Sequence, residues 1–386
     1  MLYLICDNMI TMFKKSDKKL LIIILILFLA GLVMVYSASN VTAYMYNEVD
    51  PARYFLRQIA FLIVGLVISG ILIVFPTKTY KVIFRIGFYV ACIMAVLVII
   101  YGVAMNGSKS WIGYGGFGIQ PSEFIKIFFI PFMATYYEAN RKRSDNFLAM
   151  CAPLVLVIAV IIINYLQNDC GSMIIFLLIA ASTFFISPAS KQIKIKILIG
   201  GLAVALLGVL LIFTTGDKIV PKDKLERLFY QNPCERYLTT GNQLCNGYIA
   251  INSGGLLGKG LGNSTQKYLY LPEGHTDFIF AIIIEELGLV GGIGLFLLYT
   301  YFLIRIVVIG KKSTKLSHQM ICYGIAFYFF FHIIVNVGGV TGIIPLTGIP
   351  LAFMSYGGSF LWATLIGITI VQRIAYETNT KKVEEK

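Results

Sequence analysis

Long apolar stretches alternate with short polar segments along almost the whole chain. Ten of these stretches contain about 20 residues each, which is the length that an α-helix needs to cross the hydrocarbon core of a bilayer. They lie near residues 20–39, 55–76, 82–104, 122–138, 148–166, 169–187, 193–214, 278–304, 318–340 and 356–376. The pattern predicts an all-α polytopic membrane protein, with a transmembrane domain over residues 20–376 and tails at 1–19 and 377–386.

Lysine and arginine residues are concentrated at one set of ends of these predicted helices. Those ends carry the clusters Lys14–Lys19, Lys78–Arg85, Arg141–Arg143, Lys191–Lys196, Arg305–Lys315 and Arg373–Lys386. The short loops at the opposite ends carry only Arg53, Arg57 and Lys109. Because cytoplasmic loops are the ones rich in Lys and Arg, we expect both termini in the cytoplasm. The one long loop, about residues 215–277, is then outside.

The composition agrees with this interpretation. The 386 residues are 58% hydrophobic and 13% charged, and the mean hydropathy is +0.81. A soluble domain of this size does not need so much apolar sequence. The net charge of +13 does not indicate a nucleic-acid-binding protein, because the positive residues are spread over short loops between spans. The basic start runs directly into the first apolar stretch, so we expect that helix to be retained.

Polar residues inside the apolar pattern gather at the predicted outer ends of the helices. They belong to the segments Gly107–Gly113, Gln120–Lys126, Gln167–Gly171, Ser253–Gly262, Leu271–Glu286 and Asn336–Ser359. We therefore expect a polar cavity at the outer membrane face, open to water and to lipid.

Asp277 is the strongest candidate for chemistry. It lies where the long outer loop turns back into the membrane, followed by Phe278 and Phe280. An ionisable residue at such a depth is costly to desolvate and is by default functional. The alternative is a plain cap at the start of the eighth helix.

The other polar residues have structural alternatives that the sequence leaves open. Glu123 and Lys126 are three positions apart on one helix face and could form a buried structural ion pair. Asp169 could cap the sixth helix, and Glu285 with Glu286 could serve only as contacts between spans. Trp111 could be an interfacial anchor.

The seven cysteines do not form a metal-binding pattern. Cys234 and Cys245 both lie in the outer loop, where a disulfide between them is chemically allowed but not required by the sequence. His275 has no Cys or His partner at ligand spacing, so no metal site is predicted.

Several of these segments, in this order on ten spans, resemble the SEDS family (shape, elongation, division and sporulation), which includes FtsW, RodA and SpoVE. The resemblance runs from about residue 20 to 376. Its strongest pieces are Gln120–Glu123 with Lys126, Ser253–Gly262, Leu271–Phe280 followed by Glu285–Gly288, and Thr347–Ser359. The Asn336–Gly342 pattern is closer to FtsW and SpoVE than to RodA.

The resemblance implies a peptidoglycan glycosyltransferase that polymerises lipid II into glycan strands outside the bacterial cytoplasmic membrane. It also implies a class B penicillin-binding protein as partner. The catalytic aspartate of the family falls on Asp277. Its conserved polar positions fall on Trp111, Gln120, Glu123 and Lys126.

The remaining candidate substrate contacts come from the chemistry of a lipid pyrophosphate. Lys109, Lys126, Lys259 and Lys267 are candidate phosphate contacts, because a departing pyrophosphate needs cations. The predicted substrate-binding set is completed by Asp169, Glu285 and Ser355. No cofactor is required, although a divalent cation on the pyrophosphate is compatible with the chemistry. Apolar grooves between the helices would accept the lipid tails.

The chain departs from the family pattern at two places. The family has Arg directly before Trp111, where this chain has Ser110, so Lys109 would have to replace it without bidentate geometry. The family has Pro-Asp-Leu-Gly-Thr at the start of the sixth helix, where this chain has Asn168–Ser172.

A lipid II flippase and a non-enzymatic division scaffold are the alternative functions. A flippase would need to alternate access across the membrane, and a scaffold would not need an acid at Asp277.

The topology can be tested by labelling. A cysteine introduced in loop 215–276 is expected to react with a membrane-impermeant thiol reagent added to intact cells, because that loop is outside. A cysteine next to Lys142 is expected to stay unlabelled until the cells are opened. The reverse pattern would show that the assignment of the two faces is inverted.

Overall fold

The computed structural model describes residues 15–47, 49–105, 108–114, 117–219, 233–238, 241–268 and 270–384. The helices are α2 (Lys18–Asn47), α3 (Arg53–Val74), α4 (Thr77–Tyr101), α5 (Pro121–Ala139), α6 (Phe147–Leu166), α7 (Cys170–Ile186), α8 (Lys191–Ile219), α10 (Asn242–Gly254), α11 (Ile279–Lys312), α12 (Leu316–Val340) and α13 (Gly358–Glu384). Two 3₁₀ helices, η1 (Arg141–Arg143) and η2 (Pro233–Arg236), and three strands, β1 (Val103–Met105), β2 (Ser108–Tyr114) and β3 (Phe117–Ile119), complete the described elements.

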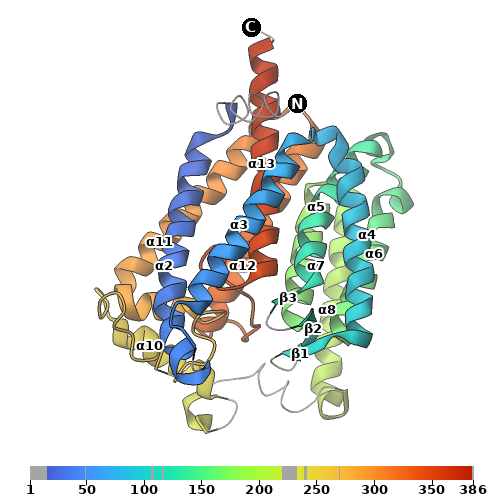
Figure 1. The fold of residues 1–386 in the computed structure, drawn as a ribbon. Helices are drawn as coiled ribbons and strands as arrows, with labels where there is room; N and C mark the ends of the chain where they lie inside the picture. The colour runs from blue at the N-terminus through green and yellow to red at the C-terminus, as the bar shows by residue number, and fades with distance from the viewer. Residues whose placement is uncertain are drawn as a thin grey trace.

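The helices form one bundle, with the first residues of α2 and the last turns of α13 at the same end of it (Figure 1). Helix α10 and the strands lie at the opposite end. Among the described residues, seven helices are long and apolar enough to cross a membrane, namely α2, α3, α4, α6, α11, α12 and α13. This confirms a polytopic membrane protein. Each of the ten predicted stretches lies on a helix, but the count of ten spans stays a prediction.

Helices α5, α12 and α13 form the interior of the bundle. Most residues of α5 are buried, and it packs against α4, α7, α12 and α13. In the most apolar windows of α12 and α13, 67% and 89% of residues are buried, compared with 17% for α3. The peripheral helices instead expose leucine, isoleucine and valine, which suits contact with lipid.

The all-α prediction needs one addition. The strands Val103–Met105, Ser108–Tyr114 and Phe117–Ile119 form a three-stranded antiparallel sheet in the order β1-β2-β3. Val103 pairs with Trp111, and Ile112 pairs with Ile119. The predicted third span, 82–104, therefore ends earlier, because α4 stops at Tyr101 and the chain continues as a strand.

The long outer loop also contains structure that the hydrophobic pattern did not predict. Helix α10 lies within it and packs on α11. Cys234 and Cys245 form a disulfide that ties η2 to α10. The mixed-charge stretch Lys222–Arg227 and most of the 1–19 tail lie outside the described residues.

The Gly-rich run after α10 folds back into the bundle at a break in α11. Gly288 has φ +70°, a conformation that interrupts the helix, and a Cβ there would lie 2.3 Å from the carbonyl oxygen of Leu256. The freed peptide groups are paired across the break. The amides of Leu289 and Val290 donate to the carbonyls of Gly255 and Leu256. The amides of Lys259 and Gly260 donate to the carbonyls of Glu285 and Glu286.

Candidate active site

Asp277 lies at the mouth of α11, outside the helix itself. It is half-buried, and its Oδ1 accepts a hydrogen bond of 3.2 Å from the Thr276 hydroxyl. Helix α11 has Phe278 as its N-cap residue, without a side-chain cap. The structure therefore does not use Asp277 as a helix cap, which was the structural alternative.

The surroundings of Asp277 favour the protonated acid. Burial is the main cause, and the nearby Glu273 carboxylate is the second; together they raise the pKa of Asp277 from 3.8 to about 7. Among the described residues, no lysine or arginine forms an ion pair with Asp277. A carboxyl group with this pKa can accept and release a proton near neutral pH.

A second loop, Leu346–Ile349, forms the other wall of a small hollow at Asp277. Val335, Asn336, Gly339 and Val340 of α12 line its floor. Gly348 has φ +66°, and a Cβ there would lie 3.6 Å from Asp277 Oδ2. Gly348 is exposed, so the rim of the hollow reaches the surface of the protein.

Ser355 forms hydrogen bonds with the backbone on both sides of this hollow. Its hydroxyl donates to the carbonyl of Thr276 at 2.6 Å and accepts from the amide of Leu351 at 2.7 Å. The amide of Tyr356 donates to the carbonyl of His275 at 2.9 Å. Ser355 was predicted to contact substrate, but its hydroxyl is already used within the protein.

Asp169 and Gln120 are joined next to this hollow. Gln120 Nε2 donates to Asp169 Oδ2 at 2.9 Å, and Asp169 Oδ1 accepts from the amide of Ser172 at 3.0 Å. Asp169 is thus the N-cap of α7, as the structural alternative proposed. A Cβ at Gly171 would lie 2.5 Å from the carbonyl oxygen of Thr347, so the start of α7 contacts the wall of the hollow.

Glu123 and Lys126 form an ion pair of 2.6 Å inside the bundle, and each residue is 1% exposed. Glu123 Oε2 has no hydrogen-bond partner among the described residues. His332 of α12 is also fully buried, in ring contact with Tyr328 at 4.6 Å. Because Lys126 is buried in this pair, its ammonium group does not reach the outer surface in this structure.

Lys109 and Trp111 occupy the small sheet. Lys109 Nζ donates to the carbonyls of Ile99 and Ile100 at 3.0 and 3.1 Å, so it neutralises the carboxyl end of α4. The Trp111 ring lies against Gly118 of β3. Ser110, at the position of the family arginine, is buried and bonds Ser108.

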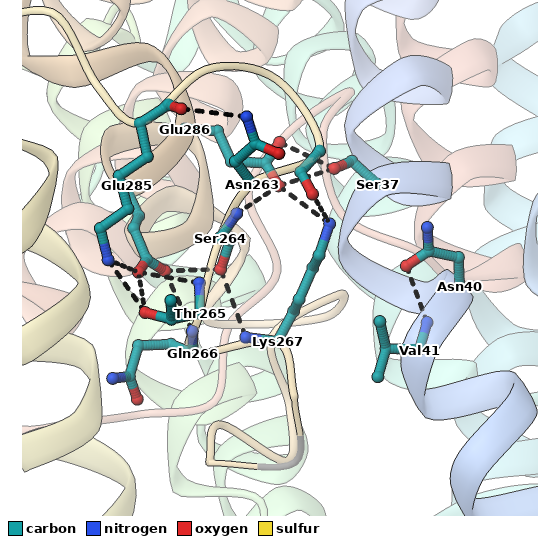
Figure 2. Close-up of polar contacts among 12 residues, drawn as sticks. Ser37, Asn40, Val41, Asn263, Ser264, Thr265, Gln266, Lys267, Glu285 and Glu286 are labelled. Carbon is teal, nitrogen blue, oxygen red and sulfur yellow. Dashed lines mark hydrogen bonds and ion pairs between the residues drawn. The ribbon is translucent and has the colours of Figure 1, made fainter.

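Lys259 pairs with Glu285 in a separate network at the break in α11. Figure 2 shows Lys267, Glu285 and Glu286 of this network. Glu285 accepts from Lys259 Nζ at 2.7 Å and from the Ser264 hydroxyl at 2.5 Å. Glu286 accepts from the hydroxyl of Ser37 on α2 at 2.7 Å and pairs with Lys267 at 3.4 Å. This network anchors the Gly-rich run to α11, and the Glu286–Ser37 bond is its contact with another predicted span.

The four lysines predicted to hold phosphate therefore all have partners within the protein. That role stays a prediction for each of them.

Sequence reasoning missed a cationic and aromatic cluster next to Asp277. The rings of Tyr54, His275 and Tyr356 lie within 4.7 to 5.7 Å of one another. The guanidinium of Arg57 lies against the Tyr356 hydroxyl, and the charge of Arg53 is close by. Burial lowers the pKa of His275, which favours the neutral ring. The signal was present in the sequence, since these two arginines are exceptions to the positive-inside pattern.

Of the predicted site residues, Asp277 lines the hollow itself. Ser355 bonds the residue before Asp277, and the Asp169–Gln120 pair lies at the start of α7, which contacts Thr347. Glu123 and Lys126 form a separate buried pair. The structure places the other predicted residues in the sheet and at the α11 break. No group of three or more His, Cys, Asp or Glu side chains within the described ranges could hold a metal ion.

The family described as Cell cycle protein, which groups FtsW, RodA and SpoVE, matches residues 18–380. The chain belongs to this family. It is 35% identical over 384 residues to the Bacillus subtilis protein named probable peptidoglycan glycosyltransferase FtsW, covering 97% of this chain and 94% of that one. It is 35% identical over 368 residues to the stage V sporulation protein E of the same organism, covering 94% of this chain and 98% of that one.

Two solved structures share the fold. One comes from work on how a peptidoglycan synthase complex coordinates polymerization and crosslinking, with a TM-score of 0.75, 23% identity and coverage of 93% of this chain and 97% of that one. The other is the rod shape determining protein RodA of Thermus thermophilus, with a TM-score of 0.66, 23% identity and coverage of 93% and 96%. The resemblance to the SEDS family seen in the sequence is confirmed.

The Glu123–Lys126 pair can be tested by its stability. Lys126→Met is expected to cost about 3 kcal/mol or more, because it leaves a buried carboxylate without its partner. The double variant Glu123→Gln, Lys126→Met is expected to recover much of this loss. Thermal unfolding in detergent measures both.

Arg305→Met is the matched control, since the Arg305–Asp17 pair is partly exposed and should cost less. A double variant as unstable as Lys126→Met would contradict a structural role for the pair.

Proposed function

We propose that this chain is a peptidoglycan glycosyltransferase that polymerises lipid II at the outer face of the bacterial cytoplasmic membrane. The observation that carries the proposal is Asp277: a half-buried acid at the mouth of a membrane helix, beside an open hollow, with a pKa of about 7. Family membership and the names of the Bacillus subtilis relatives support the same reaction.

In this reaction Asp277 is the general base. The acceptor sugar hydroxyl attacks the anomeric carbon of the donor sugar, and the new glycosidic C–O bond forms as the bond to the pyrophosphate breaks. The proton of the hydroxyl passes to the Asp277 carboxylate, and the electron pair of the broken bond leaves with the pyrophosphate oxygen. A base with a pKa near the ambient pH is well matched to this transfer.

The leaving pyrophosphate requires positive charge near the hollow. Arg57, which bonds the Tyr356 hydroxyl, and Arg53, whose charge acts on Tyr356, are our candidates for this role, because the amide of Tyr356 bonds the loop that carries Asp277. A guanidinium can bond two phosphate oxygens at once, which an ammonium cannot do with the same geometry. A divalent cation on the pyrophosphate stays a prediction.

The lipid tails would lie against the apolar surface of the helices. A small hollow lined by Phe28, Leu32, Leu62 and Leu361 also contains the polar Gln58, the neighbour of Arg57. Gln58 accepts from the amide of Gly357 and bonds the carbonyl of Ser355. The apolar side chains that the peripheral helices expose are the surface that a polyprenyl chain would contact.

We also propose a class B penicillin-binding protein as partner. The solved chain with the higher TM-score comes from a peptidoglycan synthase complex that couples polymerization to crosslinking, which supports this assignment. Purified complex given labelled lipid II separates the three alternatives. Formation of polymer indicates the enzyme, and translocation in vesicles without polymer indicates a flippase. If neither polymer nor translocation is seen, the result indicates a scaffold.

Asp277→Asn is expected to fold and to bind the partner normally but to lose polymerisation by about 100-fold or more. Asn is nearly isosteric, but it cannot accept a proton at neutral pH. Polymer formed from labelled lipid II measures the rate, and thermal unfolding checks the fold. Near-normal polymer from this variant would remove Asp277 as the base.

The rate is expected to depend on pH through Asp277. Only the carboxylate form accepts a proton, so below pH of about 7 the rate should fall about tenfold for each pH unit. Glu273→Gln removes the neighbouring negative charge, which is the second cause of the raised pKa. The inflection should then move to lower pH, but only in part, because burial remains.

The control for this measurement is Glu235→Gln, which removes one acidic charge from η2. An inflection that does not move in Glu273→Gln, or that moves equally in the control, would contradict the assignment of the titrating group.

A further inference from the structure

One side chain joins the two walls of the Asp277 hollow. Asn336 of α12 is 3% exposed, and its Nδ2 donates to the backbone carbonyl of Asp277 and to that of Ile349, both at 2.7 Å. The two hydrogens of one amide group are thus divided between two loops that are remote in the sequence. We propose that Asn336 is a positioning residue, which holds the Asp277 carboxylate at its working distance from the Gly348 loop. This inference rests on the proposed function.

The other ties between these loops lie further from the carboxylate. Ser355 bonds the carbonyl of Thr276, and Tyr356 bonds that of His275. Within the described part of the chain, Asn336 is the side chain that holds the backbone of Asp277 itself. Loss of its amide would therefore release Asp277 while the preceding residues stay fixed.

The chemistry of the position requires an amide nitrogen. Aspartate would place a carboxylate against two carbonyl oxygens, and leucine would leave both carbonyls without a donor. Asn336 Oδ1 is buried and has no hydrogen-bond partner among the described residues. A buried acceptor left without a partner is unfavourable for stability, so the two donated bonds are the reason to have asparagine here.

The position of Asp277 also sets how strongly it is desolvated. Glu273, on the same loop, is the charged group that acts on Asp277, and His275 lies on that loop as well. On α12, His332 lies one turn before Asn336. The Leu346–Ile349 loop carries no titratable side chain. If the Asn336 amide is removed, Asp277 should become more hydrated. The acid–base inflection of the rate should then move to lower pH.

The test uses the purified full chain with its partner and fluorescent lipid II. Asn336→Leu, which is similar in size and uncharged, should lower kcat by at least about tenfold, because small misplacements of a catalytic group are costly. KM should change less than about twofold, since Asn336 does not itself contact substrate in this assignment. The pH inflection should shift downward by a measurable amount.

Asn246→Leu is the matched control. Asn246 is 2% exposed, and its Nδ2 also donates to a loop carbonyl, that of Tyr270, at 2.6 Å. A purely structural loss should lower the Tm of both variants without moving the pH inflection of either. If Asn336→Leu fails to fold, Asn336→Ser keeps one hydroxyl donor and should give an intermediate kcat with an intermediate inflection.

Different results would contradict the positioning role of Asn336 and the proposed function. Polymer from the unaltered chain, none from Asp277→Asn, and a normal kcat and inflection in a folded Asn336 variant would overturn the positioning role alone. Polymer from Asp277→Asn, or none from the unaltered chain with its partner, would overturn the proposed function.

Discussion

The break in α11 at Gly288 is the constraint on which the outer half of the molecule depends. A non-helical residue inside a membrane helix frees peptide groups that lipid cannot satisfy. Here the Gly-rich run supplies the missing partners, because its backbone exchanges four hydrogen bonds with the residues on both sides of the break. Close approach of two backbones is feasible because Gly258 and Gly288 have no side chains. The short helical segment that follows Asp277 is thereby fixed at the end away from Asp277.

The two buried glutamates at that break complete the anchor. Each is fully buried, and each is paired with a lysine of the returning loop. A buried carboxylate is tolerated only with such partners, since an unpaired charge in the interior is very costly. Ser37 extends the network to α2, so the position of the Asp277 segment is coupled to a helix far from it in sequence.

Helix α12 provides the second framework of the site. It carries Tyr328, His332 and Asn336 along one buried side, at intervals of four residues, the spacing that aligns side chains on one helix face. Asn336 meets the Asp277 loop, and His332 lies deeper among aromatic rings. The polar interior of the bundle is therefore continuous from the outer hollow towards the Glu123–Lys126 pair.

The sequence by itself determined the class of the protein, the helical stretches and the candidate base. Apolar runs of membrane length permit little besides helices, and Asp277 was recognisable because an acid at a membrane boundary is rare and costly. The tertiary structure decided which polar residues meet. Lys259 and Lys267 are polar residues near one face, as expected, but they pair with Glu285 and Glu286 at the α11 break. Arg57 and Asn336 join the site because folding brings α3 and α12 to the Asp277 loop. Side-chain partners at such separations depend on how helices pack, and the hydrophobic pattern that gives each helix its length carries no information about its neighbours.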